Sequence, residues 1–401
     1  MKTWSEMSFG SILDNLRYAA IVAIGLIVGV VLSVVYAGDA DNVITEVSGI
    51  TRYGGKLLLV SDDVNGCYFE MKMDDISSAV IPIDPAKLKR IKMKGCEGVG
   101  DFESITVLAD GRVAVLSEDM HALYSQTRIG AGSWGVLVQF SQSVTEFGNR
   151  GLEGAAALPM PDGSSQVAVV WEGGYPALTS LPDQLQNSLG HSSLQPILVI
   201  TNVPRNAMGL LADDTASYRA MHTPKLKESG SVSNQPLLVD SELPKATDLE
   251  EPVTPFAQRF RSPDLVWHVW QGDDGADTGL IVLLTSENAP LRGSGAKREF
   301  KYKKLQRYDL QGRSYGTAIE INDIVKPIFD SVTPTKMKKW SERMRRQFAN
   351  VKTLLDEQNW ENVNWEGLEW FVRGQSLILV YDGVPADPPF AVVIPIPDSW
   401  K

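Results

Sequence analysis

The chain has 401 residues, which is enough for two ordinary domains or for one large β architecture. Hydrophobic residues make up 43% of it and charged residues 22%, which excludes wholesale disorder and a polytopic membrane protein. The formal net charge of -11 argues against nucleic acid as a partner, because phosphate binding needs a basic surface.

The first element in chain order is an uncharged, almost wholly apolar segment at residues 18–37. About 20 helical residues cross the roughly 30 Å hydrocarbon core of a bilayer, so this segment is predicted to be a transmembrane signal anchor. Arg17 abuts it, which predicts a cytoplasmic N-terminus at residues 1–17 and export of everything that follows, into the periplasm or another extracytoplasmic space. The alternative is a signal peptide that is cleaved after Ala37 and releases a secreted protein.

The exported part contains both cysteines of the chain, Cys67 and Cys96. A disulfide is permitted in an exported protein, but the spacing of the two residues leaves open whether they form one. Neither cysteine has a second cysteine or a histidine at metal-ligand spacing, which argues against a zinc site.

One pattern recurs through residues 39–401. Each copy has a bulky apolar residue, then Glu or Ser, a small residue, an apolar residue, a Gly- or Asp-containing turn, and an apolar run that ends in an acidic residue. Such copies predict β-hairpins, and repeated hairpins are typical of a β-propeller with four-stranded blades. We expect an all-β propeller with six blades; a β-sandwich is the alternative. The copies begin at Val47, Phe102, Leu152 and Trp365, with a degenerate copy at Asp264.

Two connections interrupt the repeat. Residues 225–256 are polar and contain prolines, which predicts a mobile loop insertion. In residues 335–356, Met337, Trp340 and Met344 recur at helical spacing and predict a helical insertion with a strongly basic outer face. That face is interpreted either as the solvated side of a helix packed on the propeller rim or as a contact for anionic lipid headgroups.

Acidic residues recur at equivalent positions of the copies, and equivalent strand ends of a propeller converge on one central channel. Converging carboxylates must be protonated, hydrogen-bonded or neutralised by a cation, and Ca²⁺ with its six to eight oxygen ligands suits such a ring. The alternative, which the repetition favours, is that each Glu accepts backbone N–H bonds and locks its blade to the next. The candidates are Glu103, Glu153 and Glu366 at strand starts, which are also the candidate catalytic acids or bases, and Asp62, Asp63, Glu118, Glu172 and Asp382 at strand ends.

The segments around Glu103, Glu153 and Glu366 resemble the phytase-like propellers, the "esterase-like activity of phytase" family. The resemblance extends over residues 40–397 and includes Asn149-Arg150-Gly151-Leu152-Glu153-Gly154 and Asn364-Trp365-Glu366-Gly367. It implies a propeller fold, an extracytoplasmic location and hydrolysis of a phosphate or carboxylate ester. This chain departs from the family pattern at Ser48, where another Glu could stand, and in the two insertions.

Three functions follow as hypotheses. The first is a membrane-anchored binding or assembly module, with the lipid bilayer as partner through residues 18–37 and another envelope protein as a second partner. The alternative is a Ca²⁺-dependent phosphoesterase or esterase that acts in the periplasm, and the third is a purely structural envelope component. No G-x-S-x-G nucleophile motif and no P-loop occur in the sequence, so ester hydrolysis would depend on the acidic set.

Overall fold

The computed structural model describes residues 44, 46–73, 79–140, 151–171, 196–221, 224–226, 232–236, 256–272, 275–290, 299–357, 363–381 and 389–400. All of them belong to one compact unit, Ile44–Lys401. The predicted anchor at residues 18–37 lies outside the described residues, as do Glu172 and Asp382. Within the described ranges, no helix is both long and apolar enough to cross a bilayer.

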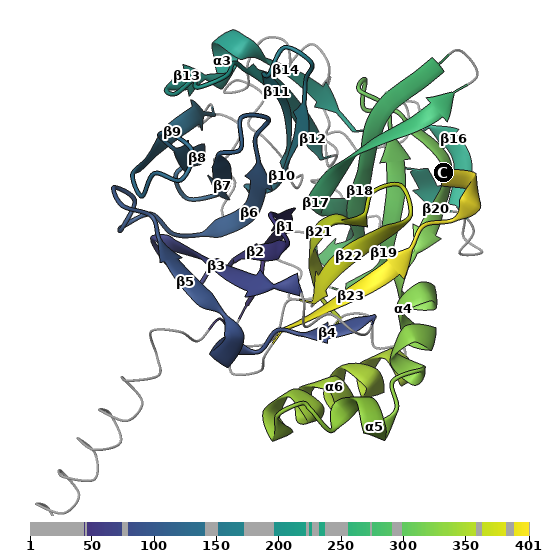
Figure 1. Cartoon of the computed structure of the whole chain (residues 1–401). Coiled ribbons are helices and arrows are strands. Elements are labelled where there is room, and N and C mark those ends of the chain that lie inside the picture. The colour runs from purple at the N-terminus through teal and green to yellow at the C-terminus, as the bar shows by residue number, and fades with distance from the viewer. Residues whose placement is uncertain are drawn as a thin grey trace, which may run out of the picture. The chain divides into compact units, whose positions relative to one another are not determined.

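Five sheets of four or five strands form the main body of the described residues, beside a two-stranded sheet, and each of the five begins with the innermost of its strands (Figure 1). From the inside outward, the first blade has β1 (Gly49–Tyr53), β2 (Lys56–Val60), β3 (Cys67–Lys72) and β5 (Lys89–Lys92), and the second has β6 (Phe102–Val107), β7 (Val113–Ser117), β8 (Ala122–Gln126) and β9 (Trp134–Gln139), with β13 (Leu210–Leu211) added in parallel. The third blade has β10 (Leu152–Pro159), β11 (Ser165–Trp171), β12 (Ile197–Val203) and β14 (Ala216–Ala220). The fourth has β17 (Phe256–Gly272), β18 (Gly275–Pro290), β19 (Glu299–Tyr308) and β20 (Ser314–Glu320), and the fifth has β21 (Trp365–Val372), β22 (Ser376–Tyr381), β23 (Phe390–Pro395) and β4 (Val80–Pro82).

The innermost strands contact one another in a closed ring, in the order β1, β6, β10, β17, β21 and back to β1. A closed ring of radial sheets is a β-propeller, so the predicted fold is confirmed. The expected number of six blades is wrong, because the described residues form five. The fourth blade has long inner strands, 17 residues in β17 and 16 in β18, and helices rather than a further sheet follow β20.

The ring is closed by a strand from the first blade's own connection. β4 leaves the sheet of β1–β3 and pairs antiparallel with β23, so the fifth blade takes its outermost strand from the beginning of the propeller. Two further backbone bonds flank this pairing, from Ile83 N to Pro389 O at 3.0 Å and from Val393 N to Ala79 O at 2.8 Å. The start and the end of the ring are thereby joined by hydrogen bonds.

The second strand of a blade is buried on both faces, as its continuous apolar run predicts. Every residue of β7 is buried, as is every residue of β22 after Ser376. In the first blade, Cys67 on β3 and Cys96 after β5 are buried free thiols, so the structure contains no disulfide between them. Burial raises the pKa of both thiols, that of Cys96 to about 11.

Helices lie between β20 and β21, where the helical insertion is predicted. They are α4 (Ile321–Asp330), α5 (Pro334–Met337) and α6 (Glu342–Asp356). The predicted single helix is divided in two because the Ser341 hydroxyl caps α6 by accepting the backbone N–H of Met344 at 3.3 Å. Phe348 of α6 stacks on Phe329 of α4 with ring centroids 4.9 Å apart and also contacts Phe390 of the fifth blade.

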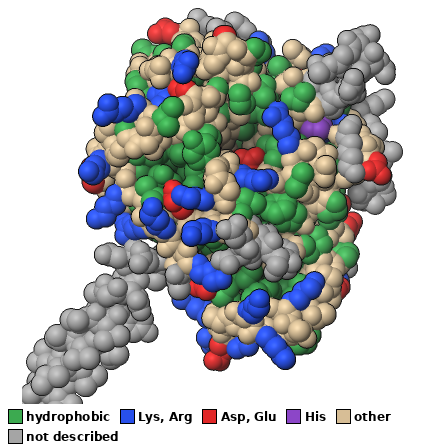
Figure 2. All heavy atoms as spheres, viewed as in Figure 1, with side chains coloured by type: hydrophobic (Ala, Val, Ile, Leu, Met, Phe, Trp, Pro, Cys, Tyr) green, Lys and Arg blue, Asp and Glu red, His purple; other side chains and the backbone are tan. Residues whose placement is uncertain are grey.

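The outer face of these helices is basic and exposed. Figure 2 shows Lys and Arg side chains on the surface in the region of the helices. The exposed ones are Lys336, Lys338, Lys339, Arg345 and Arg346. The structure therefore agrees with a helix packed on the propeller rim, and the lipid contact stays a prediction.

The predicted loop at residues 225–256 contains regular structure. β15 (Pro224–Leu226) pairs antiparallel with β16 (Val232–Pro236), which corrects the prediction of an unstructured connection for these residues. The rest of this segment up to residue 255 lies outside the described residues. The remaining short helices are α3 (Ala212–Thr215), η4 (Pro85–Lys87) and η9 (Asp398–Trp400).

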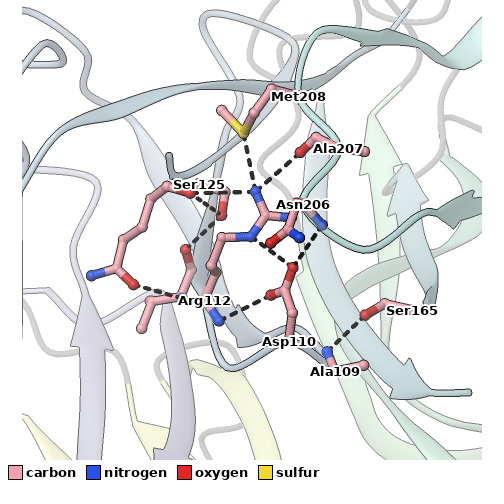
Figure 3. Close-up of polar contacts among 10 residues, drawn as sticks. Ala109, Asp110, Arg112, Ser125, Ser165, Asn206, Ala207 and Met208 are labelled. Atoms are coloured by element: carbon pink, nitrogen blue, oxygen red, sulfur yellow. Dashed lines mark hydrogen bonds and ion pairs between the residues drawn. The ribbon is translucent and has the colours of Figure 1, made fainter. Parts of the chain in front are cut away.

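A buried ion pair fixes the turn between β6 and β7 (Figure 3). Arg112 is 0% exposed, and its Nε donates to Asp110 Oδ2 at 2.9 Å. Its Nη1 donates to the carbonyl oxygen of Ala207 at 3.0 Å, and the backbone N–H of Asn206 donates to Asp110 Oδ2 at 3.1 Å. Burial acts to raise the pKa of Asp110, but these hydrogen bonds and the Arg112 charge lower it overall. The pair thus connects the turn to the segment after β12.

Candidate functional site

The five innermost strands run in the same direction around the channel. Ser104 Oγ of β6 donates to the carbonyl of Ala155 on β10 at 3.2 Å, and two residues further along both strands Ala157 N donates to Thr106 Oγ1 at 3.0 Å. Equivalent positions also meet around the rest of the ring, at Gly154–Asp264, Ala156–Trp267, Asp264–Leu368, Trp267–Trp370 and Thr51–Glu369. The starts of these strands therefore meet at one end of the channel.

The recurrent Glu of the sequence pattern stands at a β-bulge. In β6, Phe102 pairs with Ser117 and Ser104 with Leu116, so Glu103 is the extra residue between them. In β10, Glu153 has the same place between Leu152 and Gly154. The register of β21 shifts in the same way between Trp365 and Leu368, across Glu366. A bulge turns the unpaired residue away from the regular alternation, which places these three side chains at the channel end.

The small residue after the Glu allows neighbouring blades to approach closely. A Cβ added to Gly154 would lie 2.6 Å from the Cα of Asp264 on β17. A Cβ on Gly49 of β1 would lie 2.6 Å from the Cα of Ser104 on β6. In the repeated motif, the Glu therefore directs a carboxylate toward the channel end, and the small residue after it lets neighbouring blades come into close contact.

Replacing Gly154 with alanine is expected to destabilise the propeller by about 1–3 kcal/mol, because the new methyl group would overlap backbone atoms rather than a flexible side chain. The midpoint of urea unfolding, followed by tryptophan fluorescence, measures the effect. Gly98→Ala is the matched control, because Gly98 has open space around its Cα and no positive φ. Equal midpoints for the two variants would contradict the close-contact role of Gly154.

The carboxylates at the channel end repel one another strongly. Glu103 is 8% exposed, and burial together with the charges of Glu153 and Glu366 raises its pKa well above the ordinary value. Burial and the charges of Asp119 and Asp62 raise the pKa of Asp101 to about 6. An acidic set that favours its protonated forms is also one that a bound cation would stabilise.

Two groups within this set have the spacing of metal ligands. Carboxylate oxygens of Asp101, Glu103 and Glu118 lie within 4.8 Å of one another, and those of a second group of three do the same: Glu46, Asp62 and Asp63. Oxygens that bind one Ca²⁺ at about 2.4 Å are at most about 4.8 Å apart, so the donor type and spacing fit this ion. The groups adjoin each other, because the charge of Asp62 acts on both Asp101 and Glu103.

Other acids of the channel lock blades together, in the way that the alternative hypothesis proposed for the recurrent Glu residues. Asp264 of β17 accepts the backbone N–H of Leu368 on β21 at 2.6 Å and that of Leu265 at 2.8 Å. Glu369 of β21 accepts the Thr51 hydroxyl of β1 at 2.6 Å and the backbone N–H of Trp370 at 2.6 Å. Glu103 differs from both, because its hydrogen-bond partner among the described residues is the side chain of Asp101.

The structure thus brings together Asp62, Asp63, Glu103, Glu118, Glu153 and Glu366 from the predicted set. Glu118 reaches the third blade, where a Cβ on Gly151 would lie 2.2 Å from its Cγ. Glu46 and Asp101 were not predicted as site residues. Each directly precedes the first residue of a copy, Val47 or Phe102, and the other copies have no acidic residue at this position. Asp264 was also not predicted as a site residue, because it stands at the start of the degenerate copy and meets Gly154 and Leu368 rather than the Glu positions of the neighbouring blades.

Comparison with known proteins does not identify a family. No family model matches the chain, and no curated protein matches it, so the resemblance to the phytase-like propellers stays a prediction. A thermostable family-43 glycoside hydrolase is similar in structure at 10% identity and a TM-score of 0.35, covering 88% of this chain and 91% of that one. A calcium-binding regucalcin from Agrobacterium tumefaciens has 8% identity, a TM-score of 0.33 and coverages of 88% and 92%. Likenesses this weak identify no activity.

Proposed function

We propose that this chain is an exported, membrane-attached β-propeller that binds a divalent cation such as Ca²⁺ at the acidic end of its channel. In this proposal the loaded propeller is a binding or assembly module for another envelope protein. The observation that supports cation binding is the cluster of Asp101, Glu103 and Glu118, whose oxygens lie within 4.8 Å of one another. The cation would neutralise the repulsion that otherwise raises the pKa values of these groups.

The membrane attachment rests on the apolar segment at residues 18–37. The basic face of α5 and α6, with Lys338, Lys339 and Arg346 exposed, suits a second contact with anionic headgroups. Alkaline carbonate extraction of membranes tests the attachment, and the protein is expected to stay in the pellet. A mature protein that begins at Gly38 would contradict the anchor.

A metal-dependent phosphoesterase of the phytase-like kind is the second candidate function. It is favoured by Glu103, because burial and the neighbouring carboxylates raise the pKa of this group and so favour the protonated form that a general acid needs. A cation held beside it would polarise a phosphoryl oxygen. This candidate predicts hydrolysis of phytate or p-nitrophenyl phosphate, whereas the module predicts binding without turnover.

Calorimetric titration of Ca²⁺ into the detergent-solubilised full chain at pH 8 tests the proposed cation site. We expect saturable binding and a higher unfolding temperature in the same buffer. Absence of both would remove the cation site and the phosphoesterase together. Binding without release of nitrophenol would leave the module as the function.

A further inference from the structure

A second site is formed at the opposite end of the channel. A cavity of about 240 Å³ lies beyond the acidic strand starts and is lined by residues of all five innermost strands. The residues that line the cavity come later in each strand than the acidic residues do. In the first three blades the lining starts at Ile50, Ile105 and Ala155, each two residues after the recurrent acidic or serine position. The channel therefore has two chemically different ends.

Most residues that line this cavity have apolar side chains, but polar atoms make up slightly more of its exposed surface than apolar atoms do. Ile105, Leu265 and Leu368 contribute aliphatic surface, and two tryptophans contribute rings. The indole N–H of Trp267 donates to the carbonyl of Ala156 at 2.9 Å, and that of Trp370 donates to the carbonyl of Trp267 at 2.7 Å. Because both donors are satisfied by backbone oxygens, the tryptophan rings are held in place and contribute apolar surface to the site.

Two arginines supply the charge at this end. Arg52, near the end of β1, donates from Nη1 to the carbonyl oxygen of Phe371 and lies over the Phe371 ring at 5.9 Å. Arg373, in the turn after β21, is exposed, and its charge opposes the burial that raises the pKa of Glu369 in the same lining. The acidic residue of the lining, Glu369, already accepts the Thr51 hydroxyl and the Trp370 N–H. With Arg52, Arg373 and Glu369, the lining therefore has a surplus of one positive charge.

We propose that this end of the channel binds a small organic anion, with its acidic group on the arginines and its apolar body in the cavity. A dry cavity of about 150 Å³ is enough for a benzene ring, so 240 Å³ accommodates a ring with one acidic substituent. Arginine is the side chain best suited to carboxylate or phosphate groups, because its planar guanidinium donates two parallel hydrogen bonds to them. This site is independent of the cation site.

The test uses phenyl phosphate as probe and the quenching of tryptophan fluorescence in the detergent-solubilised full chain, with EDTA present so that no metal takes part. Trp267 and Trp370 line the cavity, so binding there is expected to change their emission. We expect saturable quenching by phenyl phosphate and at least tenfold weaker binding of benzyl alcohol, which lacks the charge.

Arg373→Gln is expected to weaken phenyl phosphate binding about tenfold or more, since a charge-assisted hydrogen bond is lost. Arg128→Gln is the control, because Arg128 is exposed and does not line the cavity. Absence of saturable quenching, equal affinities of the two probes, or an unchanged affinity in Arg373→Gln would overturn the proposal.

Discussion

Replacing Arg112 with methionine is expected to destabilise the propeller by about 3–5 kcal/mol, because it removes one partner of a buried ion pair. Asp110 would keep the backbone N–H bonds from Asn206 and Arg112 but lose the guanidinium charge, in a site where its side chain is 3% exposed. The bond that holds the segment at Ala207 would be lost as well. Urea unfolding, with the slope checked for two-state behaviour, measures the loss of unfolding free energy.

The chain offers a matched control in its fourth blade. Arg313 donates from Nε to Asp309 Oδ2 at 2.7 Å in a similar turn, but its side chain is 64% exposed. Exposed pairs contribute about 1 kcal/mol or less, so Arg313→Met should leave the stability nearly unchanged. Similar losses in the two variants would show that burial does not decide the strength of these pairs.

Replacing Glu103 with glutamine is expected to abolish the stabilisation of the propeller by Ca²⁺. A ligand present at about 100 times its Kd stabilises a folded protein by about 2.7 kcal/mol, and this increment should disappear with the central carboxylate. Without Ca²⁺ the variant should be at least as stable as the wild type, because a buried charge facing Glu153 and Glu366 is removed. Thermal unfolding with EDTA and with Ca²⁺ at about 100 times its Kd gives both quantities.

Glu342→Gln serves as the control for this experiment. Glu342 is exposed in the first turn of α6, and it is not part of either carboxylate group. Its replacement should leave the Ca²⁺ response intact. If Glu103→Gln instead unfolds the protein in EDTA, Glu103 is a blade lock like Asp264, and the cation hypothesis loses its central ligand.

The fold was largely predictable because its signal is local. A hairpin with an apolar second strand can be recognised from a few residues, and Phe102 to Ser117 is the clearest case. The number of blades was not predictable, because it depends on how long β17 and β18 extend and on the pairing of β4 with β23. The pairing of Val80 with Val392 cannot be recognised from the sequence of either segment, because the two residues are far apart in the chain.

The candidate site was predictable where it repeats. Glu103, Glu153 and Glu366 have a common sequence context, so their convergence followed from the fold. Their place at β-bulges was not predictable, and neither was the division of roles, in which Asp264 locks two blades and Glu103 joins the carboxylate group. The bulges depend on how neighbouring strands pair, and the roles depend on which backbone N–H groups lie within hydrogen-bond distance of each carboxylate. Only the tertiary structure determines either.

The most direct test of the acidic channel end is the unfolding temperature of the wild-type chain at pH 5 and pH 8, with EDTA and with Ca²⁺. The folded-state pKa values are raised, to about 6 for Asp101 and about 7 for Glu46, so the folded protein binds protons more tightly than the unfolded chain. This contribution to stability is present below the unfolded pKa values and is lost as the pH rises through 6 and 7. We therefore predict that in EDTA the unfolding temperature falls from pH 5 to pH 8, and that Ca²⁺ restores it at pH 8. An unfolding temperature that Ca²⁺ leaves unchanged at pH 8 would contradict the account.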